Sequence, residues 1–119
     1  MNEITINGVT YIPKDEAITT KVNTEGLKYC IIRTYSAGVH AGYVKERNGK
    51  EVVLVNARRL WRWAGAFTLS ELAFKGVSKP DECKFSIEIP EIILTEAIEI
   101  IPCTEKAHGS IKEVNNYEV

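Results

Sequence analysis

Apolar and polar residues alternate along the first half of the chain and predict three successive strands. The first covers residues 28–35 and carries apolar side chains on both faces, which is typical of a strand covered on both sides. The second covers residues 39–47 and the third residues 50–55. Between them, Asn48-Gly49 is a favoured tight-turn pair, because both residue types tolerate a positive φ. The pattern therefore predicts an antiparallel meander.

Further strands are predicted on both sides of this meander. Residues 4–12 are rich in β-branched side chains around Asn7-Gly8, which indicates a hairpin. Residues 84–89 alternate strictly, and Pro90 is expected to stop that strand or to mark an edge, because proline has no N–H to donate. Residues 92–101 predict one strand kinked near Thr95, or two short strands.

Two short helices are also predicted. Thr68-Leu69-Ser70-Glu71 has the form of a capping box, so we expect a helix over residues 69–75 with Gly76 just beyond its end. Thr104 is expected to cap a second short helix that runs through about residue 108. Together these elements predict a single domain over residues 1–119. Its expected class is α+β and mainly antiparallel β, as a bent sheet or partly open barrel with one or two short helices.

The stretch from Asn56 to Trp63 fits either secondary structure. In a strand, Arg59, Trp61 and Trp63 share one face; in a helix, Leu60 and Trp61 fall on one apolar stripe. Gly65 follows too soon for a long helix, so we favour a short strand or a single turn.

Charge and composition limit the partners that this domain can have. The chain has 45% apolar and 26% charged residues, which is ordinary globular composition. Its formal net charge of -1 gives no overall field that would attract DNA or an anionic membrane, so any anion site must be local. No apolar run approaches the roughly 20 residues that span a bilayer, and the chain starts without a basic and apolar leader. We expect a soluble cytosolic protein.

Three cysteines, Cys30, Cys83 and Cys103, are widely separated and lack the C-x-x-C spacing of zinc ribbons. We expect them to be small buried apolar side chains. Cys103 and His108 could approach each other near a helix start, but local pairing of ligands is otherwise missing. No metal site and no cofactor are expected.

Catalytic signatures are sparse. The sequence contains no G-x-S-x-G, H-E-x-x-H, Walker or Rossmann motif. His40 could act as a general base beside Ser36, although histidines in strands are more often structural or exposed. Glu96 and Glu99 are three residues apart in a predicted strand, so they face opposite sides and cannot share a proton. We expect no enzymatic activity.

The arginines and tryptophans between positions 58 and 63 favour a binding site instead. Guanidinium groups form bidentate hydrogen bonds to phosphate, and indole rings stack on bases. Arg33 and Tyr35 on a neighbouring strand could add one more phosphate contact and one more ring. The residues expected to bind ligand are Arg33, Tyr35, Arg58, Arg59, Trp61, Arg62 and Trp63.

Two other interpretations of this stretch remain open. One tryptophan could belong to the core while the arginines pair with some of the 14 glutamates. Single-stranded nucleic acid would use the same residue types, but it also needs a continuous positive groove, and the lysines here alternate with glutamates, as in Lys45-Glu46 and Lys50-Glu51. This pattern favours a compact ligand over a nucleic-acid polymer.

Several segments resemble a family of small uncharacterised phage and prophage proteins that carry a domain of unknown function. They are residues 33–42 (RTYSAGVHAG), 56–61 (NARRLW), 68–73 (TLSELA) and 91–102 (EIILTEAIEIIP), and the resemblance extends over about two thirds of the chain. It implies a protein encoded by a phage or prophage and located in the cytoplasm of the host.

Small phage proteins of this size with nucleotide pockets include sponges of the Thoeris anti-defence type, which hold cyclic ADP-ribose variants as homo-oligomers without cleaving them. By analogy with these sponges, we expect a homodimer or higher oligomer that sequesters a small nucleotide immune signal, either a cyclic ADP-ribose variant or a cyclic oligonucleotide. The alternative is a protein-protein interaction module, either an inhibitor of a host defence protein or a virion accessory, whose Arg-Trp patch is an interface hot spot.

Overall fold

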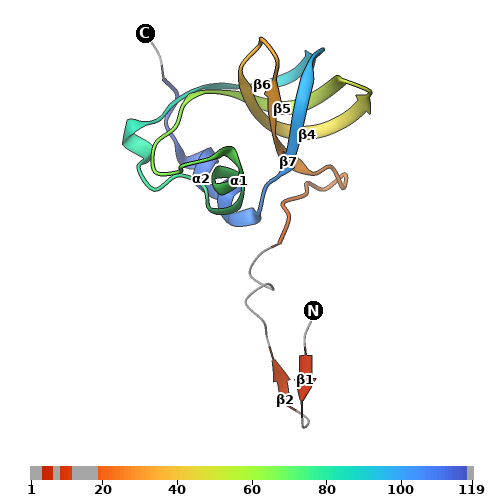
Figure 1. The fold of residues 1–119 in the computed structure, drawn as a ribbon, viewed down its shortest axis with the longest axis vertical. Helices are drawn as coiled ribbons and strands as arrows, with labels where there is room; N and C mark the ends of the chain where they lie inside the picture. The colour runs from red at the N-terminus through yellow and green to blue at the C-terminus, as the bar shows by residue number, and fades with distance from the viewer. Residues whose placement is uncertain (1–3, 7–8, 12–18, 118–119) are drawn as a thin grey trace.

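The computed structural model describes residues 4–6, 9–11 and 19–117 (Figure 1). The elements follow one another as β1 (Ile4–Ile6), β2 (Val9–Tyr11), β3 (Tyr29–Thr34), β4 (Val39–Asn48), β5 (Glu51–Arg62), α1 (Leu69–Lys75), the 3-10 turn η2 (Pro80–Glu82), β6 (Lys84–Leu94), β7 (Ala97–Pro102) and α2 (Glu105–Glu113). Strands β1 and β2 pair antiparallel in a sheet of their own, as the hairpin prediction required. The expected turn pair Asn7-Gly8 lies outside the described residues.

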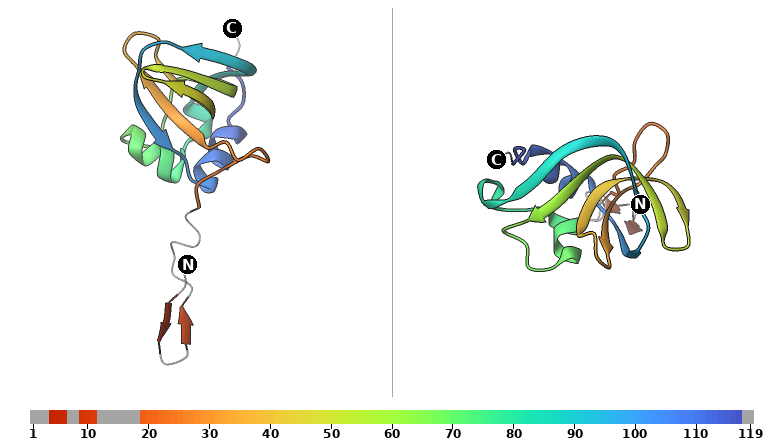
Figure 2. Two further views of the ribbon diagram at one scale, coloured as in Figure 1. Left: turned by 90° about the vertical axis from the view of Figure 1, so that its right-hand side faces the viewer. Right: turned by 90° about the horizontal axis from the view of Figure 1, so that it is seen from above.

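The other five strands form one antiparallel sheet in the order β6-β5-β4-β3-β7. Although β6 and β7 lie at opposite edges, only Thr95 and Glu96 join them in the chain. The sheet therefore bends strongly, and the Ala97 N–H donates across the bend to the carbonyl of Lys50, with 3.0 Å between N and O. Figure 2 shows the strands curling around one another without closing. The predicted α+β class, with a bent open sheet and two short helices, is confirmed.

The bend gives the sheet two cores. One lies between the sheet and the two helices, which sit together on one side of it (Figure 1). Its largest fully buried side chains include Ile31, Leu60, Leu72, Phe85 and Ile111. The second core fills the other face of the sheet and consists of Cys30, Ile32, Val52, Leu54, Ala57 and Leu94. Strand β3 contributes to both cores, as its two apolar faces predicted.

Strand β5 is longer than predicted because the ambiguous Arg-Trp stretch continues it. Asn56 has a φ of 51°, and between the pairs Tyr43–Val55 and Ala41–Arg58 the register shifts. Two residues of β5 thus oppose one of β4, which is a β-bulge. The bulge interrupts the inward-outward alternation, so that Ala57 lies with Leu54 in the second core. The adjacent residue Arg58 is buried on the helix side of the sheet.

The bulge also explains a glycine on the partner strand. A Cβ added to Gly42 would lie 3.1 Å from Ala57 Cα and 3.3 Å from Leu54 Cβ. The neighbouring strand β5 therefore approaches Gly42 so closely that it leaves little room for a side chain there.

Both helices begin where the capping residues predict. The Glu71 N–H donates to Thr68 Oγ1 at 3.1 Å, and α1 begins and ends at the predicted residues. The Ala107 N–H donates to Thr104 Oγ1 at 3.0 Å, but α2 continues to Glu113, beyond the predicted end.

The predicted stop at Pro90 is wrong, since β6 runs through it from Lys84 to Leu94. Because β6 is an edge strand and Pro90 falls between the pairs Ala57–Ile89 and Val55–Glu91, no neighbour requires its missing N–H. The other interpretation of Pro90, an edge marker, is the one that holds. The break expected near Thr95 is real and separates β6 from β7.

Gly76, at the end of α1, offers a test of how the two helices pack. Its φ is 81°, and an added Cβ would lie 2.4 Å from Ser110 Cβ on α2. Ser110 also bonds Val77 through both its donor and its acceptor, at 3.1 and 2.9 Å. We expect Gly76→Ala to lower the free energy of unfolding by roughly 3 kcal/mol, from backbone strain and overpacking together.

Gly26 is the matched control, because its φ is also 81° and nothing lies within 4 Å of an added Cβ. Gly26→Ala should cost only about 1 kcal/mol. Urea unfolding followed by circular dichroism measures both variants. Equal losses would contradict the tight contact between α1 and α2.

Candidate functional site

Arg58 is the most deeply buried charged residue of the Arg-Trp stretch, with 5% of its surface exposed. Its Nε donates to the Ser86 carbonyl at 2.6 Å, and its Nη1 donates to the Ile111 carbonyl at 2.6 Å. Its Nη2 donates both to the Val114 carbonyl and, at 3.1 Å, to Asn116 Oδ1. Four of the five N–H donors of a guanidinium are thus engaged within the fold.

Two of these acceptors, the carbonyls of Ile111 and Val114, lie at the C-terminal end of α2, where a helix leaves its last C=O groups without intrahelical partners and carries partial negative charge. The guanidinium carbon also lies 5.2 Å from the centre of the Phe85 ring. Burial lowers the pKa of Arg58, but the ordinary value is so far above neutrality that the group stays charged. Arg58 therefore joins β5, β6 and α2.

Arg59 and Trp61 lie on the opposite side of β5 and face outward. Trp61 is 67% exposed, and Arg59 is exposed and held at its backbone by a 2.8 Å hydrogen bond to Ser86 Oγ. Two hollows flank this pair, with volumes of about 360 and about 390 Å³, and both are lined by Arg59 and Trp61. The first is completed by Lys84, Phe85, Ser86 and Tyr117, and the second by Ser36, Ala37, Gly38, Val39, Leu60 and Trp63.

Lys84 and Tyr117 extend this surface beyond β5. Lys84 Nζ lies 5.2 Å from the Trp61 ring centre and 4.9 Å from that of Tyr117, and the two rings are 5.9 Å apart. We call the surface formed by Arg59, Trp61, Lys84 and Tyr117 the tryptophan face. The ion pairs among the described residues, Arg33–Glu99 and Lys45–Glu91, leave its two cations without a carboxylate partner.

The other residues expected to bind ligand lie elsewhere. Trp63 is half-buried, packs on the helix-side core and lines the second hollow, so it contributes both to the core and to the wall of that hollow. Arg62 ends β5 and is exposed. On the far side of β4, Arg33 Nε donates to Glu99 Oε1 at 2.9 Å, and Tyr35 is 78% exposed in the following turn. The structure thus brings Arg59, Trp61 and Trp63 together at one hollow, whose lining does not include Arg33 or Tyr35.

Sequence reasoning did not find Lys84 and Tyr117. Lys84 is the first residue of a predicted strand, and Tyr117 lies beyond the last predicted helix. Lys84 meets Trp61 through the pairing of β5 with β6, and Tyr117 meets it because a bridge between Phe85 and Asn116 brings residue 117 beside β6. No local pattern in the sequence carries that contact.

His40 lies behind the tryptophan face and is 1% exposed. Its Nε2 is 3.0 Å from the Ala37 carbonyl, and because a carbonyl only accepts, this nitrogen carries a proton. Burial lowers the pKa of His40, and the charge of Arg59 lowers it further. The ring is therefore neutral at pH 7 and supports the turn before β4. No bond joins it to Ser36 in the part of the chain that the structure describes.

The three cysteines are free and buried. Burial raises the pKa of Cys30 to about 11 and that of Cys103 to about 12, and it also raises that of Cys83. Over residues 19–117 no group of three or more His, Cys, Asp or Glu side chains is placed to hold a metal ion. None of the described helices is long and apolar enough to cross a membrane.

The role of Arg58 predicts a large effect on stability. Arg58→Ala would leave the buried carbonyls of Ser86, Ile111 and Val114 without their donor, so we expect a loss of about 3 kcal/mol or more in the free energy of unfolding. Arg62→Ala removes an exposed arginine of the same strand and should change it by less than about 0.5 kcal/mol. Chemical denaturation measures both. Similar values for the two variants would show that the guanidinium of Arg58 is dispensable.

The cysteine environments predict slow alkylation. Only the thiolate is nucleophilic, and at pH 8 a pKa of about 11 leaves on the order of one Cys30 in a thousand ionised. Iodoacetamide should therefore label urea-unfolded protein within minutes and native protein far more slowly, as mass spectrometry can follow. Rapid labelling of native Cys30 and Cys103 would contradict their burial.

The raised pKa values of the folded-state cysteines also predict how stability depends on pH. The free energy of unfolding should be constant below about pH 9 and should fall as the pH rises from about 9 towards 12.

Comparison with known proteins gives a family and no activity. No curated protein and no solved structure matches the chain significantly. Residues 27–111 match DUF6948, a domain of unknown function. This match extends from β3 into α2 and covers the bent sheet, α1, most of α2 and all of the Arg-Trp stretch. The chain therefore belongs to the DUF6948 family.

Proposed function

We propose that this protein is a non-enzymatic binding protein whose tryptophan face holds a small phosphate-bearing nucleotide. The observation that carries the proposal is the position of Trp61, which is 67% exposed between two hollows that Arg59 also lines. A large indole left in water next to unpaired cations is a costly arrangement unless a ligand covers it.

The chemistry of the face matches the two ends of a nucleotide. Stacking of a base on an aromatic side chain is worth roughly 1–3 kcal/mol, and both Trp61 and Tyr117 offer rings. Arg59 provides a planar fork that matches phosphate oxygens, and Lys84 provides a point charge above both rings. Ser36, Ala37 and Gly38 line the far wall of the second hollow, where small side chains leave room for a sugar or a second base.

Arg58 enters the proposal as a support and not as a phosphate ligand. Its donors are engaged by α2 and β6, and its contact with Ser86 helps to hold the two strands that carry Arg59 and Lys84. Arg62 lies at the end of β5, and we assign it only a contact with the outer part of the ligand. Arg33 would have to release Glu99 to bind an anion, and neither it nor Tyr35 lines the two hollows.

The resemblance to phage and prophage proteins described above extends this proposal to a biological role. Segments 33–42, 56–61, 68–73 and 91–102 support an origin in a phage or prophage and a location in the cytoplasm of the host. By analogy with phage sponges, the ligand would be a cyclic ADP-ribose variant or a cyclic oligonucleotide, and a homo-oligomer would remove this immune signal from a host defence pathway without cleaving it.

A protein partner is the second candidate. Phe67, in the loop after β5, is 92% exposed, and Tyr35 is 78% exposed. Exposed aromatic residues beside arginines are typical of interface hot spots. In that case Trp61 would insert into a pocket of a host protein, and nucleotides would not bind.

Binding of nucleotides tests the proposal directly. Purified protein is titrated with cyclic ADP-ribose isomers and with cyclic di- and trinucleotides by isothermal calorimetry. At least one of them should bind, and Trp61→Ala and Arg59→Ala should each weaken that binding about tenfold or more, through lost stacking and a lost charged hydrogen bond. Arg47→Ala removes an exposed arginine whose Nε bonds the nearby Gly49 carbonyl, and it should leave affinity unchanged.

Heating the complex then separates a sponge from an enzyme. A sponge releases intact nucleotide, which chromatography identifies, whereas an enzyme releases a product. Binding that survives both Trp61→Ala and Arg59→Ala would refute the tryptophan face as the site, and absence of binding by every nucleotide would favour the protein partner.

A further inference from the structure

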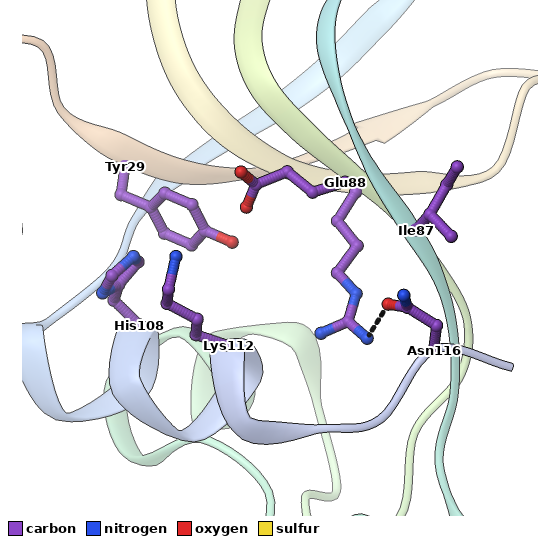
Figure 3. A pocket seen from close by; sticks show the side chains of 7 residues that line it. Tyr29, Ile87, Glu88, His108, Lys112 and Asn116 are labelled. Carbon is purple, nitrogen blue, oxygen red and sulfur yellow. Dashed lines mark hydrogen bonds between the residues drawn. The ribbon is translucent and has the colours of Figure 1, made fainter.

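A polar cavity of about 360 Å³ lies between the sheet and α2, apart from the tryptophan face (Figure 3). Tyr29 enters it from β3, Glu88 from β6, and His108 and Lys112 from α2. A water molecule in the liquid takes up roughly 30 Å³, so the cavity holds much more than one water. Its size suits a small organic molecule.

The tyrosine at the base of this cavity has an unpartnered hydroxyl group. Tyr29 is 3% exposed, and its ring is fixed edge-on against Tyr43 at 5.0 Å and His108 at 4.5 Å. Figure 3 shows its hydroxyl group pointing into the cavity between Glu88 and Lys112. Among the described residues this hydroxyl makes no hydrogen bond, and Figure 3 draws none from it. Buried polar groups nearly always have a partner, so this group indicates a bound molecule.

The charges around the cavity define what could bind there. Lys112 and the remaining N–H of Arg58 are cationic, and Glu88 is anionic. Burial lowers the pKa of His108, and Lys21 and Lys112 lower it further, so this ring is neutral at pH 7. Burial raises the pKa of Tyr29 well above its ordinary value, so its hydroxyl remains a donor. The cavity thus has one net positive charge and a donor at its base.

Glu88 requires a hydrogen-bond donor on the ligand. One of its oxygens accepts a hydrogen bond from Asn56 Nδ2 at 3.2 Å, which leaves the other oxygen free to accept. Glu88 and Lys112 form no ion pair with each other, although both line the cavity. A ligand that satisfies both carries an anionic group for Lys112 and a hydrogen-bond donor, such as a hydroxyl, for Glu88.

We propose that this cavity is a second binding site, for a small hydroxyl-bearing organic anion of the size of a sugar monophosphate. The Tyr29 hydroxyl and Lys112 donate to the anionic group, and Glu88 accepts from a ligand hydroxyl. The site lies on the helix side of the sheet and does not use Arg59, Trp61 or Lys84, so it is independent of the proposed nucleotide site.

The probes are ribose 5-phosphate, inorganic phosphate and ribose, titrated into the full chain and followed by two-dimensional NMR of the His108 ring and the α2 amides. Ribose 5-phosphate is expected to shift these signals with saturation, inorganic phosphate more weakly, and ribose not at all. If ribose 5-phosphate leaves the signals of His108 and α2 unchanged up to millimolar concentration, the proposal is wrong.

Tyr29→Phe and Lys112→Gln identify the donors. Each should weaken binding of ribose 5-phosphate about tenfold, as expected for loss of a hydrogen bond to a charged group. Lys106→Gln, which removes an exposed lysine of α2 outside the cavity lining, is the matched control and should leave the affinity unchanged. Affinity that is unaffected by Tyr29→Phe would overturn the site.

Stability without ligand is a second readout for Tyr29→Phe. Because the hydroxyl has no protein partner, its removal should leave the melting temperature of the ligand-free protein unchanged or raise it. Ribose 5-phosphate should then raise the melting temperature of the native protein more than that of the variant. A clear drop in the melting temperature of ligand-free Tyr29→Phe would show that the hydroxyl has a structural partner, and would count against a ligand site.

Discussion

The hydrogen bonds between Arg58 and the end of α2 are the interaction on which the rest of the structure depends. The last carbonyls of a helix lack intrahelical partners, and here Ile111 and Val114 turn theirs towards one buried guanidinium. The same group bonds the Ser86 carbonyl of β6. One side chain therefore fixes α2 against the open edge of the sheet. It also positions Asn116, and so brings the end of the chain beside β6.

This arrangement divides the Arg-Trp stretch into an inner and an outer part. The bulge at Asn56 places Arg58 inside, and the strand then turns Arg59 and Trp61 outward. The inner arginine serves the fold. The outer pair, with Lys84 and Tyr117, forms the surface on which the proposed nucleotide would lie. The arginines and tryptophans form one cluster in the sequence, but the sheet separates the residue that stabilises the fold from those proposed to bind the ligand.

Local signals predicted much of the fold. Alternation located β3, β4 and the first part of β5, and the capping residues Thr68 and Thr104 located both helices, because these effects depend on near neighbours in the chain. The bulge at Asn56 could not be predicted in this way, since its φ of 51° is imposed by pairing with β4. The two interpretations of Pro90 could not be separated for a similar reason: the cost of this proline depends on whether its strand is an edge strand, which is a property of the whole sheet.

The candidate site was less predictable than the fold. Residue type alone drew attention to positions 58–63, but it could not distinguish Arg58 from Arg59, because burial depends on the register of β5. Side-chain NMR of the arginines tests this distinction most directly. The Nε–H of Arg58, bonded to the Ser86 carbonyl, should exchange slowly with solvent, whereas that of Arg59 should exchange rapidly. Slow exchange at Arg59 and rapid exchange at Arg58 would contradict the account.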